Sequence, residues 1–407
     1  MKPTGPIPPE FAEKNGELVI AGKVASAWIA QAGETPLFVY DAQMIADRVA
    51  SLRAAMPQRL AIHYAVKANP FAPLLRHMAG LVDGFDVASS GEMDAAIAAG
   101  MNRDDISFAG PGKSDDELRA AIRAGVTLNL ESSGELDRAL AIGEDLTIAP
   151  QLAIRVNPDF DLRGSGMKMG GGARPFGIDV EHVPALIQKI RAAGAQYRGL
   201  HIYAGSQALD ADAVSEAQAA TIALAARLSA DHPLPHVNLG GGFGIPYFPG
   251  DEPLDIAAVG NALGAVFDDL PDALQHTRFA IELGRWPVGT AGVYLTRVLD
   301  VKESHGSRFA VVDGGLHHQL AASGNFGTVV RRNYPVALAN RFGAPVIDSP
   351  QTIVGRLCTP LDRLADQVAL PTIREGDVVA IFCAGAYGAS ASPSAFLGHG
   401  PAVEILG

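Results

Sequence analysis

The chain has 407 residues, of which 48% are hydrophobic and 19% charged, and this composition excludes an intrinsically disordered protein. The formal net charge of −12 argues against a nucleic-acid or anionic-membrane surface, and two cysteines cannot form a disulfide scaffold. Prolines replace the apolar run of a signal peptide, and no stretch of about 18 apolar residues occurs. We therefore expect a cytoplasmic protein with reduced thiols, no membrane partner and no metal, long enough for two domains.

Short β-rich runs alternate with helical segments from Leu37 onward. The segment before Leu37 contains a weak strand at residues 18–20 and is expected to pack with the C-terminal domain. Eight strands are predicted, at residues 61–66, 84–88, 106–109, 127–130, 152–156, 199–203, 236–239 and 279–282. Residues 115–124 and 182–193 show the helical pattern between them. Eight such units predict an α/β (β/α)₈ TIM barrel, with a doubly wound open sheet as the alternative.

The pattern changes after Glu282. Further strands are predicted at residues 293–302, 308–313, 352–354 and 377–383, without strong helices between them. This pattern favours a C-terminal antiparallel β-barrel or sandwich domain. We expect the barrel to span residues 37–285, and the β domain to comprise residues 1–36 and 286–407.

Polar residues and glycines follow the predicted strands, where a barrel of this type has its active site. Lys67 ends an apolar run and suits an amine nucleophile, or else extends to solvent. Glycines 240–242 and the Gly205-Ser206 pair suit a phosphate, although a flexible turn has the same composition. Glu282 and Arg285 are either a surface ion pair or contacts to a ring nitrogen and a phosphate. Together these residues favour a ligand with an aldehyde, a phosphate and a basic ring nitrogen, which describes pyridoxal phosphate.

The motifs resemble those of the fold-type III pyridoxal-phosphate decarboxylases, the family of diaminopimelate, ornithine and arginine decarboxylases. The resemblance covers essentially the whole chain. It rests on Tyr64–Asn69, Phe85–Ser89, Arg155–Pro158, Gly199–His201, Gly205–Gln207, Gly240–Gly242, Glu282–Arg285, Val312–Gly315, Cys358 with Asp362, and Gly385–Tyr387. The family fold, a (β/α)₈ barrel followed by a β domain, agrees with the pattern above.

The resemblance implies a role for each matching residue. Lys67 resembles the lysine that binds the cofactor aldehyde, and Glu282 resembles the carboxylate that keeps the pyridine nitrogen protonated. Cys358 resembles the residue that reaches the partner subunit's site and protonates the product, which implies an obligate head-to-tail homodimer with shared active sites. The remaining cofactor contacts implied by the family are Asp86, Tyr203, Ser206, Gly241, Gly242, Arg285 and Tyr387. The implied reaction is loss of carbon dioxide after the substrate amine displaces Lys67.

Two departures from the family pattern bear on the cofactor ring and the substrate. Tyr203 occupies the position of the stacking histidine, so we expect Tyr203 to stack, with His201 beside it as a catalytic residue. Thr359 replaces the acid that binds a distal amine, which argues against a basic substrate. Arg331 or Arg332 is expected to bind a substrate carboxylate. The expected substrate-binding residues are Arg331, Arg332, Tyr334, Thr359 and Asp362.

The long connection from residue 315 to 332 and the Gly-rich loop at residues 164–172 resemble a decarboxylase subgroup associated with exosortase systems. Some members act on an amino acid tethered to a carrier protein. The expected partner is therefore a free amino acid or a carrier-linked one. A racemase and a non-catalytic cofactor carrier are the alternatives. Glu282 argues against the racemase, because racemases of that kind place an arginine there, and the retained β domain argues against the carrier.

Overall fold

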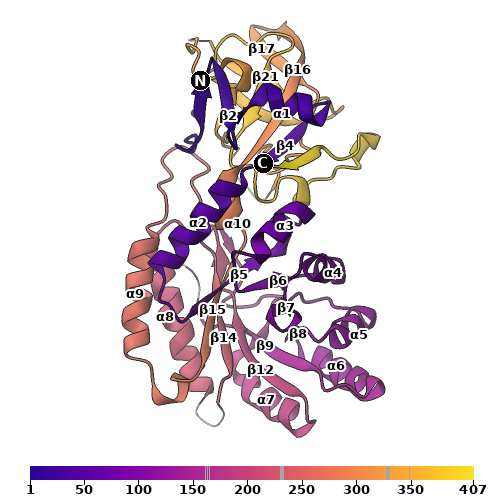
Figure 1. Cartoon of the computed structure of the whole chain (residues 1–407), viewed down its shortest axis with the longest axis vertical. Helices are drawn as coiled ribbons and strands as arrows, with labels where there is room; N and C mark the ends of the chain where they lie inside the picture. The colour runs from indigo at the N-terminus through magenta and orange to yellow at the C-terminus, as the bar shows by residue number, and fades with distance from the viewer. Residues whose placement is uncertain (161, 163, 165, 230–232, 327–330, 348) are drawn as a thin grey trace. The chain divides into compact units, whose positions relative to one another are not determined.

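The computed structural model describes residues 1–407 except 161, 163, 165, 230–232, 327–330 and 348. Two compact units are present (Figure 1). The barrel unit comprises Val49–Gly244 and Leu254–Gly284, and the sheet unit comprises Met1–Arg48, Ile245–Pro253 and Arg285–Gly407. The division differs from the expected boundaries at 37 and 285, because residues 37–48 and Ile245–Pro253 belong to the sheet unit.

The barrel unit contains a closed ring of eight parallel strands. In sequence order they are β5 (Leu60–Ala65), β6 (Gly84–Val87), β7 (Ile106–Phe108), β8 (Thr127–Leu130), β9 (Gln151–Asn157), β12 (Gln196–Ile202), β14 (His236–Gly241) and β15 (Arg278–Leu283). Each pairs with its neighbour, and β15 closes the ring on β5. The predicted TIM barrel is confirmed, and the open doubly wound sheet is excluded. Short strands β10 (Met167–Lys168), β11 (Ile178–Asp179) and β13 (Gly205–Ser206) lie outside the ring.

Helices connect the barrel strands. They are α2 (Ala42–Ala55, shared with the sheet unit), α3 (Ala72–Ala79), α4 (Ser90–Ala98), α5 (Asp115–Ala124), α6 (Ser133–Leu146), α7 (Val183–Ala192), α8 (Ala211–Leu228) and α9 (Ile256–Asp268). Three consecutive helices begin after a serine followed three residues later by a glutamate. Ser89, Ser114 and Ser132 each accept a hydrogen bond from the backbone N–H of that glutamate. These caps fix where each helix begins, directly after the strand ends that carry the site.

The sheet unit contains a three-stranded antiparallel sheet, formed by the first three strands of the chain, and an eight-stranded mixed sheet in which antiparallel pairs predominate. Its strands are β1 (Ala12–Lys14), β2 (Glu17–Ile20), β3 (Lys23–Val24), β4 (Leu37–Tyr40), β16 (Gly292–Ser304), β17 (Ser307–Val312), β18 (Val336–Leu338), β19 (Gln351–Val354), β20 (Arg363–Val368), β21 (Val378–Ile381) and β22 (Val403–Leu406). Two pairs are parallel, β17 with β19 and β22 with β4. Helices α1 (Ala25–Ala32) and α10 (Arg285–Val288) complete the unit.

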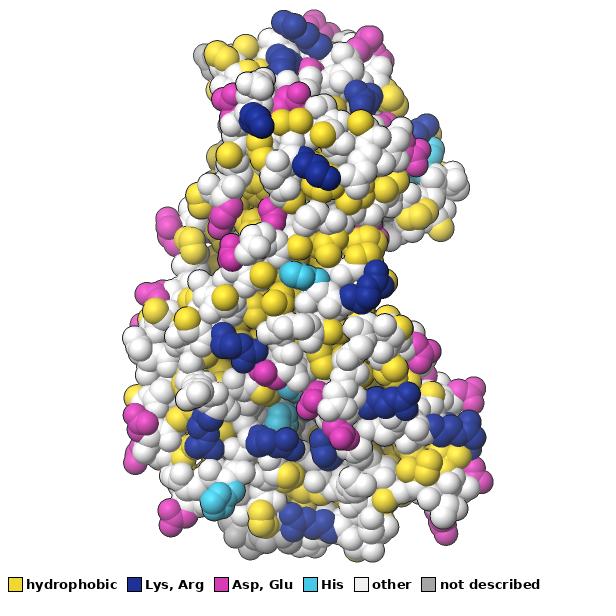
Figure 2. Space-filling view, viewed as in Figure 1, with side chains coloured by type: hydrophobic (Ala, Val, Ile, Leu, Met, Phe, Trp, Pro, Cys, Tyr) yellow, Lys and Arg dark blue, Asp and Glu magenta, His cyan; other side chains and the backbone are white. Residues whose placement is uncertain are grey.

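The core of the sheet unit joins the two ends of the sequence. Leu18, Trp28 and Val39 pack in one buried cluster with Val293 and Phe382. The N-terminal segment therefore packs with residues from the C-terminal third of the sequence. Among the described residues, no helix is long and apolar enough to cross a membrane. On the face seen in Figure 2, basic and acidic side chains are interspersed over both units.

Candidate active site

The expected site residues divide between the two units. The barrel unit carries Lys67, Asp86, His201, Tyr203, Ser206, Gly241, Gly242 and Glu282. The sheet unit carries Arg285, Arg331, Arg332, Tyr334, Cys358, Thr359, Asp362 and Tyr387.

Lys67, Glu282 and His201 form the centre of the barrel site. Lys67 lies in a 3₁₀ turn (Val66–Ala68) directly after β5, and its Nζ lies 3.2 Å from Oε1 of Glu282. His201 Nε2 lies 2.7 Å from the other carboxylate oxygen, Oε2. The order of strands in the ring produces this arrangement. His201 is on β12, Glu282 is on β15 with only β14 between them, and β15 pairs with β5, which precedes Lys67. Lys67 is not in the strand itself, and its side chain is 44% exposed. Burial is therefore not what determines the reactivity of its amine.

The buried Glu282 side chain is ionised. Burial acts to raise its pKa, but the charge of Lys67 and the hydrogen bond from His201 outweigh burial and hold that pKa well below its usual range. Because the carboxylate can only accept, His201 donates through Nε2. The result is a fixed negative charge inside the barrel.

Tyr203 contacts Lys67, whereas Asp86 contacts Ser107 and His63. Lys67 Nζ is 5.6 Å from the ring centroid of Tyr203, which follows the end of β12. Asp86, on β6, accepts a hydrogen bond from Ser107 and lies 3.5 Å from Nδ1 of His63. Burial acts to lower the pKa of His63, yet the hydrogen bond and charge of Asp86 raise it overall.

Glycines 240–242 pass close to neighbouring backbone. Gly241 is in register with Glu282, and a Cβ on Gly241 would lie 1.9 Å from the Glu282 carbonyl oxygen. Gly242 has a φ of +81°, and a Cβ there would lie 2.3 Å from the carbonyl oxygen of Gly205. Any other residue would therefore push the strand end away from Glu282 and from the Gly205-Ser206 strand. Ser206 pairs with Met167 across β10 and β13.

Arg285 is surrounded by tyrosine rings in the sheet unit. Its guanidinium lies 4.9 Å from the ring of Tyr387 and 5.3 Å from that of Tyr247, and Nη1 donates to the Tyr247 hydroxyl at 2.9 Å. Its buried Nε has no hydrogen-bond partner among the described residues. Tyr387 holds this position with a φ of +57°, which is strained for a tyrosine. An arginine with an unused donor suits an anion.

The loop bearing Cys358 and Thr359 is held by Asp362. The two carboxylate oxygens of Asp362 accept from the backbone N–H groups of Leu316 and Leu357, at 2.7 and 2.9 Å. Both oxygens therefore accept backbone hydrogen bonds, and Asp362 positions the loop. Cys358 is an exposed free thiol, and the Thr359 hydroxyl accepts from Leu361 N–H at 3.3 Å.

Three expected substrate contacts lie elsewhere in the sheet unit. Arg331 donates to the Arg363 carbonyl at 3.3 Å, and burial lowers its pKa. Arg332 covers the Phe248 ring at 3.8 Å. Tyr334 is buried, 4.7 Å from the Tyr247 ring. The glycine-rich loop at 164–172 and the connection from 315 to 332 lie partly outside the described residues.

Sequence reasoning gave no role to two buried ion pairs behind the site. Arg155 Nη1 lies 2.8 Å from Glu131, and Lys113 Nζ lies 2.6 Å from Glu135. The glutamate three residues after each serine cap was the available signal for Glu135. Among the described residues, no cluster of three or more His, Cys, Asp or Glu could hold a metal ion.

These residues fit pyridoxal phosphate. The ionised, buried Glu282 suits a protonated pyridine nitrogen, and the accessible amine of Lys67 suits an aldehyde. Gly241 and Gly242 offer the close backbone approach that a phosphate requires. Within the sheet unit, the Nε of Arg285, which has no partner among the described residues, suits an anion such as a phosphate.

The comparisons agree with this chemistry. The family model described as "Pyridoxal-dependent decarboxylase, pyridoxal binding domain" matches residues 42–289. The L-glutamyl-[BtrI acyl-carrier protein] decarboxylase of Niallia circulans is 35% identical over 381 residues, covering 92% of this chain and 89% of that protein. The diaminopimelate decarboxylase of Methanothermobacter thermautotrophicus is 32% identical over 393 residues, covering 93% and 87%.

Solved structures with the same fold include a diaminopimelate decarboxylase. The diaminopimelate decarboxylase of Helicobacter pylori in complex with L-lysine superposes with a TM-score of 0.83 at 27% identity, covering 94% of this chain and 93% of that one. The protein AQ1208 from Aquifex aeolicus superposes with a TM-score of 0.85 at 28% identity, covering 98% and 92%.

Proposed function

The chain belongs to the pyridoxal-dependent decarboxylases, and we propose that its substrate is an acidic amino acid, such as an L-glutamyl group, joined to a carrier protein. The family assignment makes it a pyridoxal-phosphate enzyme that removes carbon dioxide from amino acids or their carrier-linked derivatives. The specific substrate is the part that is proposed.

The observation that carries the proposal is the neutral residue after Cys358. A diamine substrate brings a distal ammonium group that needs a carboxylate partner when it is buried. Thr359 offers only a hydroxyl there, and that hydroxyl already accepts from Leu361 N–H. An acyl group attached to a carrier ends in a neutral linkage, which Thr359 tolerates. The Niallia circulans relative, whose name specifies a carrier-bound L-glutamyl substrate, supports this choice.

The cofactor supplies an aldehyde for the substrate amine and a ring that takes up the electron pair released with carbon dioxide. We propose that Lys67 Nζ would hold the cofactor through its aldehyde. The ionised Glu282, whose pKa is lowered, would favour a proton at the ring nitrogen. His201 keeps the Glu282 carboxylate oriented through Nε2, and Tyr203 would lie against the ring. Proposed phosphate contacts are Ser206, Gly241, Gly242, Arg285 and Tyr387, with Asp86 near the aldehyde end.

Cys358 is proposed to deliver the proton to the product carbon in a partner subunit's site, so the active assembly is a homodimer. Its exposed thiol supports a role toward another molecule. Arg331, Arg332 and Tyr334 remain proposed substrate contacts. A reduced thiol also fits a cytoplasmic location.

Mixing Lys67→Ala with Cys358→Ala subunits tests the shared site. The mixture should recover about a quarter of wild-type activity, because half of the dimers are hybrids and each hybrid has one of its two sites intact. No recovery would contradict it.

The substrate experiment compares carbon dioxide release from L-glutamyl-carrier protein, free L-glutamate and diaminopimelate. The carrier-linked substrate should have a kcat/KM at least about 100-fold above that for diaminopimelate, the discrimination expected when a buried charge lacks its partner. Thr359→Glu should raise the diaminopimelate value, whereas Thr359→Ser should not. A preference of the unmodified enzyme for diaminopimelate would reject the proposal.

A further inference from the structure

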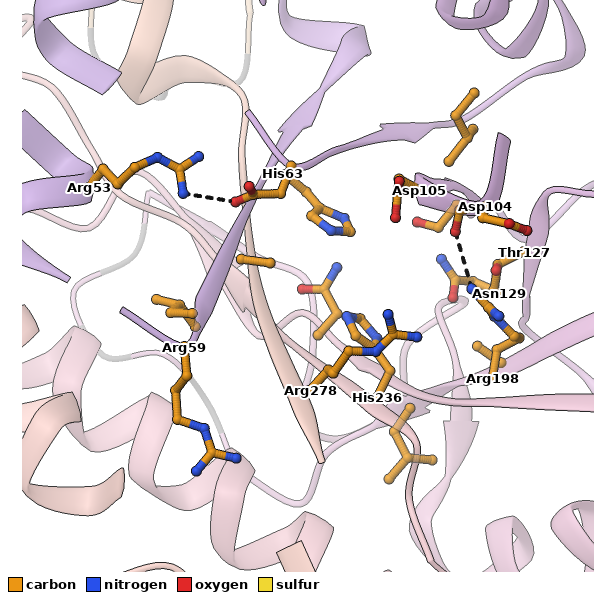
Figure 3. A pocket seen from close by; sticks show the side chains of 18 of the residues that line it. Arg53, Arg59, His63, Asp104, Asp105, Thr127, Asn129, Arg198, His236 and Arg278 are labelled. Atoms are coloured by element: carbon orange, nitrogen blue, oxygen red, sulfur yellow. Dashed lines mark hydrogen bonds and ion pairs between the residues drawn. The ribbon is translucent and has the colours of Figure 1, made fainter. Parts of the chain in front are cut away.

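The barrel unit contains a cavity of about 330 Å³ at the amino ends of its strands (Figure 3). It is lined by residues at or near strand starts, including Ala61, Ile106, Thr127, His236 and Arg278. Lys67 and Glu282 belong to the carboxyl ends of β5 and β15. The cavity therefore opens at the end of the barrel opposite to the active site.

Opposite charges face each other across this cavity. Figure 3 shows Asp104 and Asp105 on one side and Arg278 on the other. The Arg278 guanidinium has no hydrogen bond or ion pair with any described residue. In contrast, Arg53 is paired with Asp83 at 3.0 Å, and Arg59 donates to two backbone carbonyls. Arg198 donates to the Asp104 carbonyl at 3.1 Å, so the exposed Arg278 is the lining arginine whose side chain makes no hydrogen bond or ion pair with a described residue.

Asn129 adds a buried donor beside this space. Its side chain is 2% exposed, and its Nδ2 has no hydrogen-bond partner among the described residues. A buried amide left without a partner costs about 1–3 kcal/mol. A ligand oxygen in the cavity would satisfy it.

The inner wall is formed by two stacked histidines. The rings of His63 and His236 are 6.0 Å apart, at 20° to each other. Burial, with the nearby positive charges, lowers the pKa of His236 to about 3, so this ring is neutral at pH 7. The neutral His236 ring suits the carbon chain of a ligand between its two charged ends, whereas Asp86 raises the pKa of the neighbouring His63.

We propose that this cavity binds a small zwitterion of the amino-acid class, with its carboxylate at Arg278 and its ammonium group at Asp105, on the opposite side of the cavity. An anion alone would face Asp104 and Asp105, and an amine alone would face Arg198 and Arg278. A ligand with both charges satisfies both sides. The volume is at the lower end of the range of small-molecule sites, which also limits the ligand to a few carbons.

The test uses holoenzyme reduced with borohydride, so that no amine can react with the cofactor aldehyde. Calorimetric titration compares 4-aminobutyrate with butyrate and butylamine, which each carry one of its two charges. We expect saturable binding of 4-aminobutyrate at least tenfold tighter than that of either singly charged compound. Absence of saturable binding, or equal binding of butyrate, would overturn the proposal.

Variants then locate the binding. Arg278→Gln and Asp105→Asn should each weaken 4-aminobutyrate binding at least tenfold, and they act from opposite sides of the cavity. Arg123→Gln, at an exposed arginine of α5, is the matched control and should bind as the unmodified enzyme does. Circular dichroism confirms that each variant is folded. Unchanged binding in both folded cavity variants would overturn the proposal.

Discussion

The buried Lys113–Glu135 pair provides a quantitative test of how the barrel unit is held together. Lys113 is 1% exposed at its side chain, and its Nζ lies 2.6 Å from Glu135 Oε1. The same Nζ donates to the carbonyls of Gly110 and Asn129, at 2.6 and 3.0 Å. Lys113→Met keeps the length of the stem and removes the charge together with all three contacts.

The expected loss of unfolding free energy follows from the carboxylate that the substitution leaves buried. Glu135 is 3% exposed, so the substitution leaves a buried carboxylate without its cation. Removing one partner of a buried pair costs about 3–5 kcal/mol. For a unit of this size each kcal/mol lowers the melting temperature by about 2–4 °C, so we expect a decrease of about 12 °C.

Urea denaturation followed by circular dichroism measures this loss. Lys189→Met is the matched control, because Lys189 pairs with Asp137 on the surface, where both side chains are about half exposed, and surface pairs contribute about 0–1 kcal/mol. Lys113→Met with Glu135→Leu should recover about half of the loss, since no unpaired charge then remains buried. The reasoning is refuted if Lys113→Met costs no more than Lys189→Met, or if the double variant is no more stable than the single one.

Three further outcomes are expected. Glu282→Gln should lower kcat at least about 100-fold while cofactor absorbance is retained, because a neutral amide does not hold a proton at the ring nitrogen; near-normal turnover would contradict this. His236 has a folded-state pKa of about 3, below its unfolded value of 6.5, so its contribution to stability falls as the pH decreases from 6.5 toward 3, by at most about 1.4 kcal/mol per pH unit. His236→Gln should therefore show a flatter dependence of unfolding free energy on pH in urea titrations at pH 7, 6 and 5, and an unchanged slope would disprove the assignment. Asp362→Ala should destabilise the enzyme by about 3 kcal/mol in the same assay, because Leu316 and Leu357 lose a charged acceptor, whereas a loss near zero would show that the backbone finds other partners.

The barrel could be predicted because each strand carries its own local signal. The run at residues 127–130 is strand β8 without change of boundary, and residues 115–124 are helix α5, ended by Gly125 in a left-handed conformation. Ser114 and Glu117 form the capping box that begins α5. Such signals depend on a few neighbouring residues, so they are readable without the fold.

The parts that were not predictable depend on contacts distant in sequence. The association of Ile245–Pro253 with the sheet unit leaves no local pattern. The same is true of Tyr247 as a partner of Arg285, which only the fold brings together. Asp362 was recognised as a motif residue, but its use by two backbone amides required the loops to be seen side by side.

Strand β4 has a consequence for the order in which the chain can fold. All four of its residues are buried, and it pairs with β16 and β22, whose sequences begin about 250 and 360 residues later. During synthesis on the ribosome β4 emerges early and stays without its partners until the whole barrel has been made. An apolar strand waiting in this way is a site for mispairing between nascent chains. A circular permutant that begins after Tyr40 and carries β4 at its end should therefore give a higher soluble yield than the natural order at a fast translation rate.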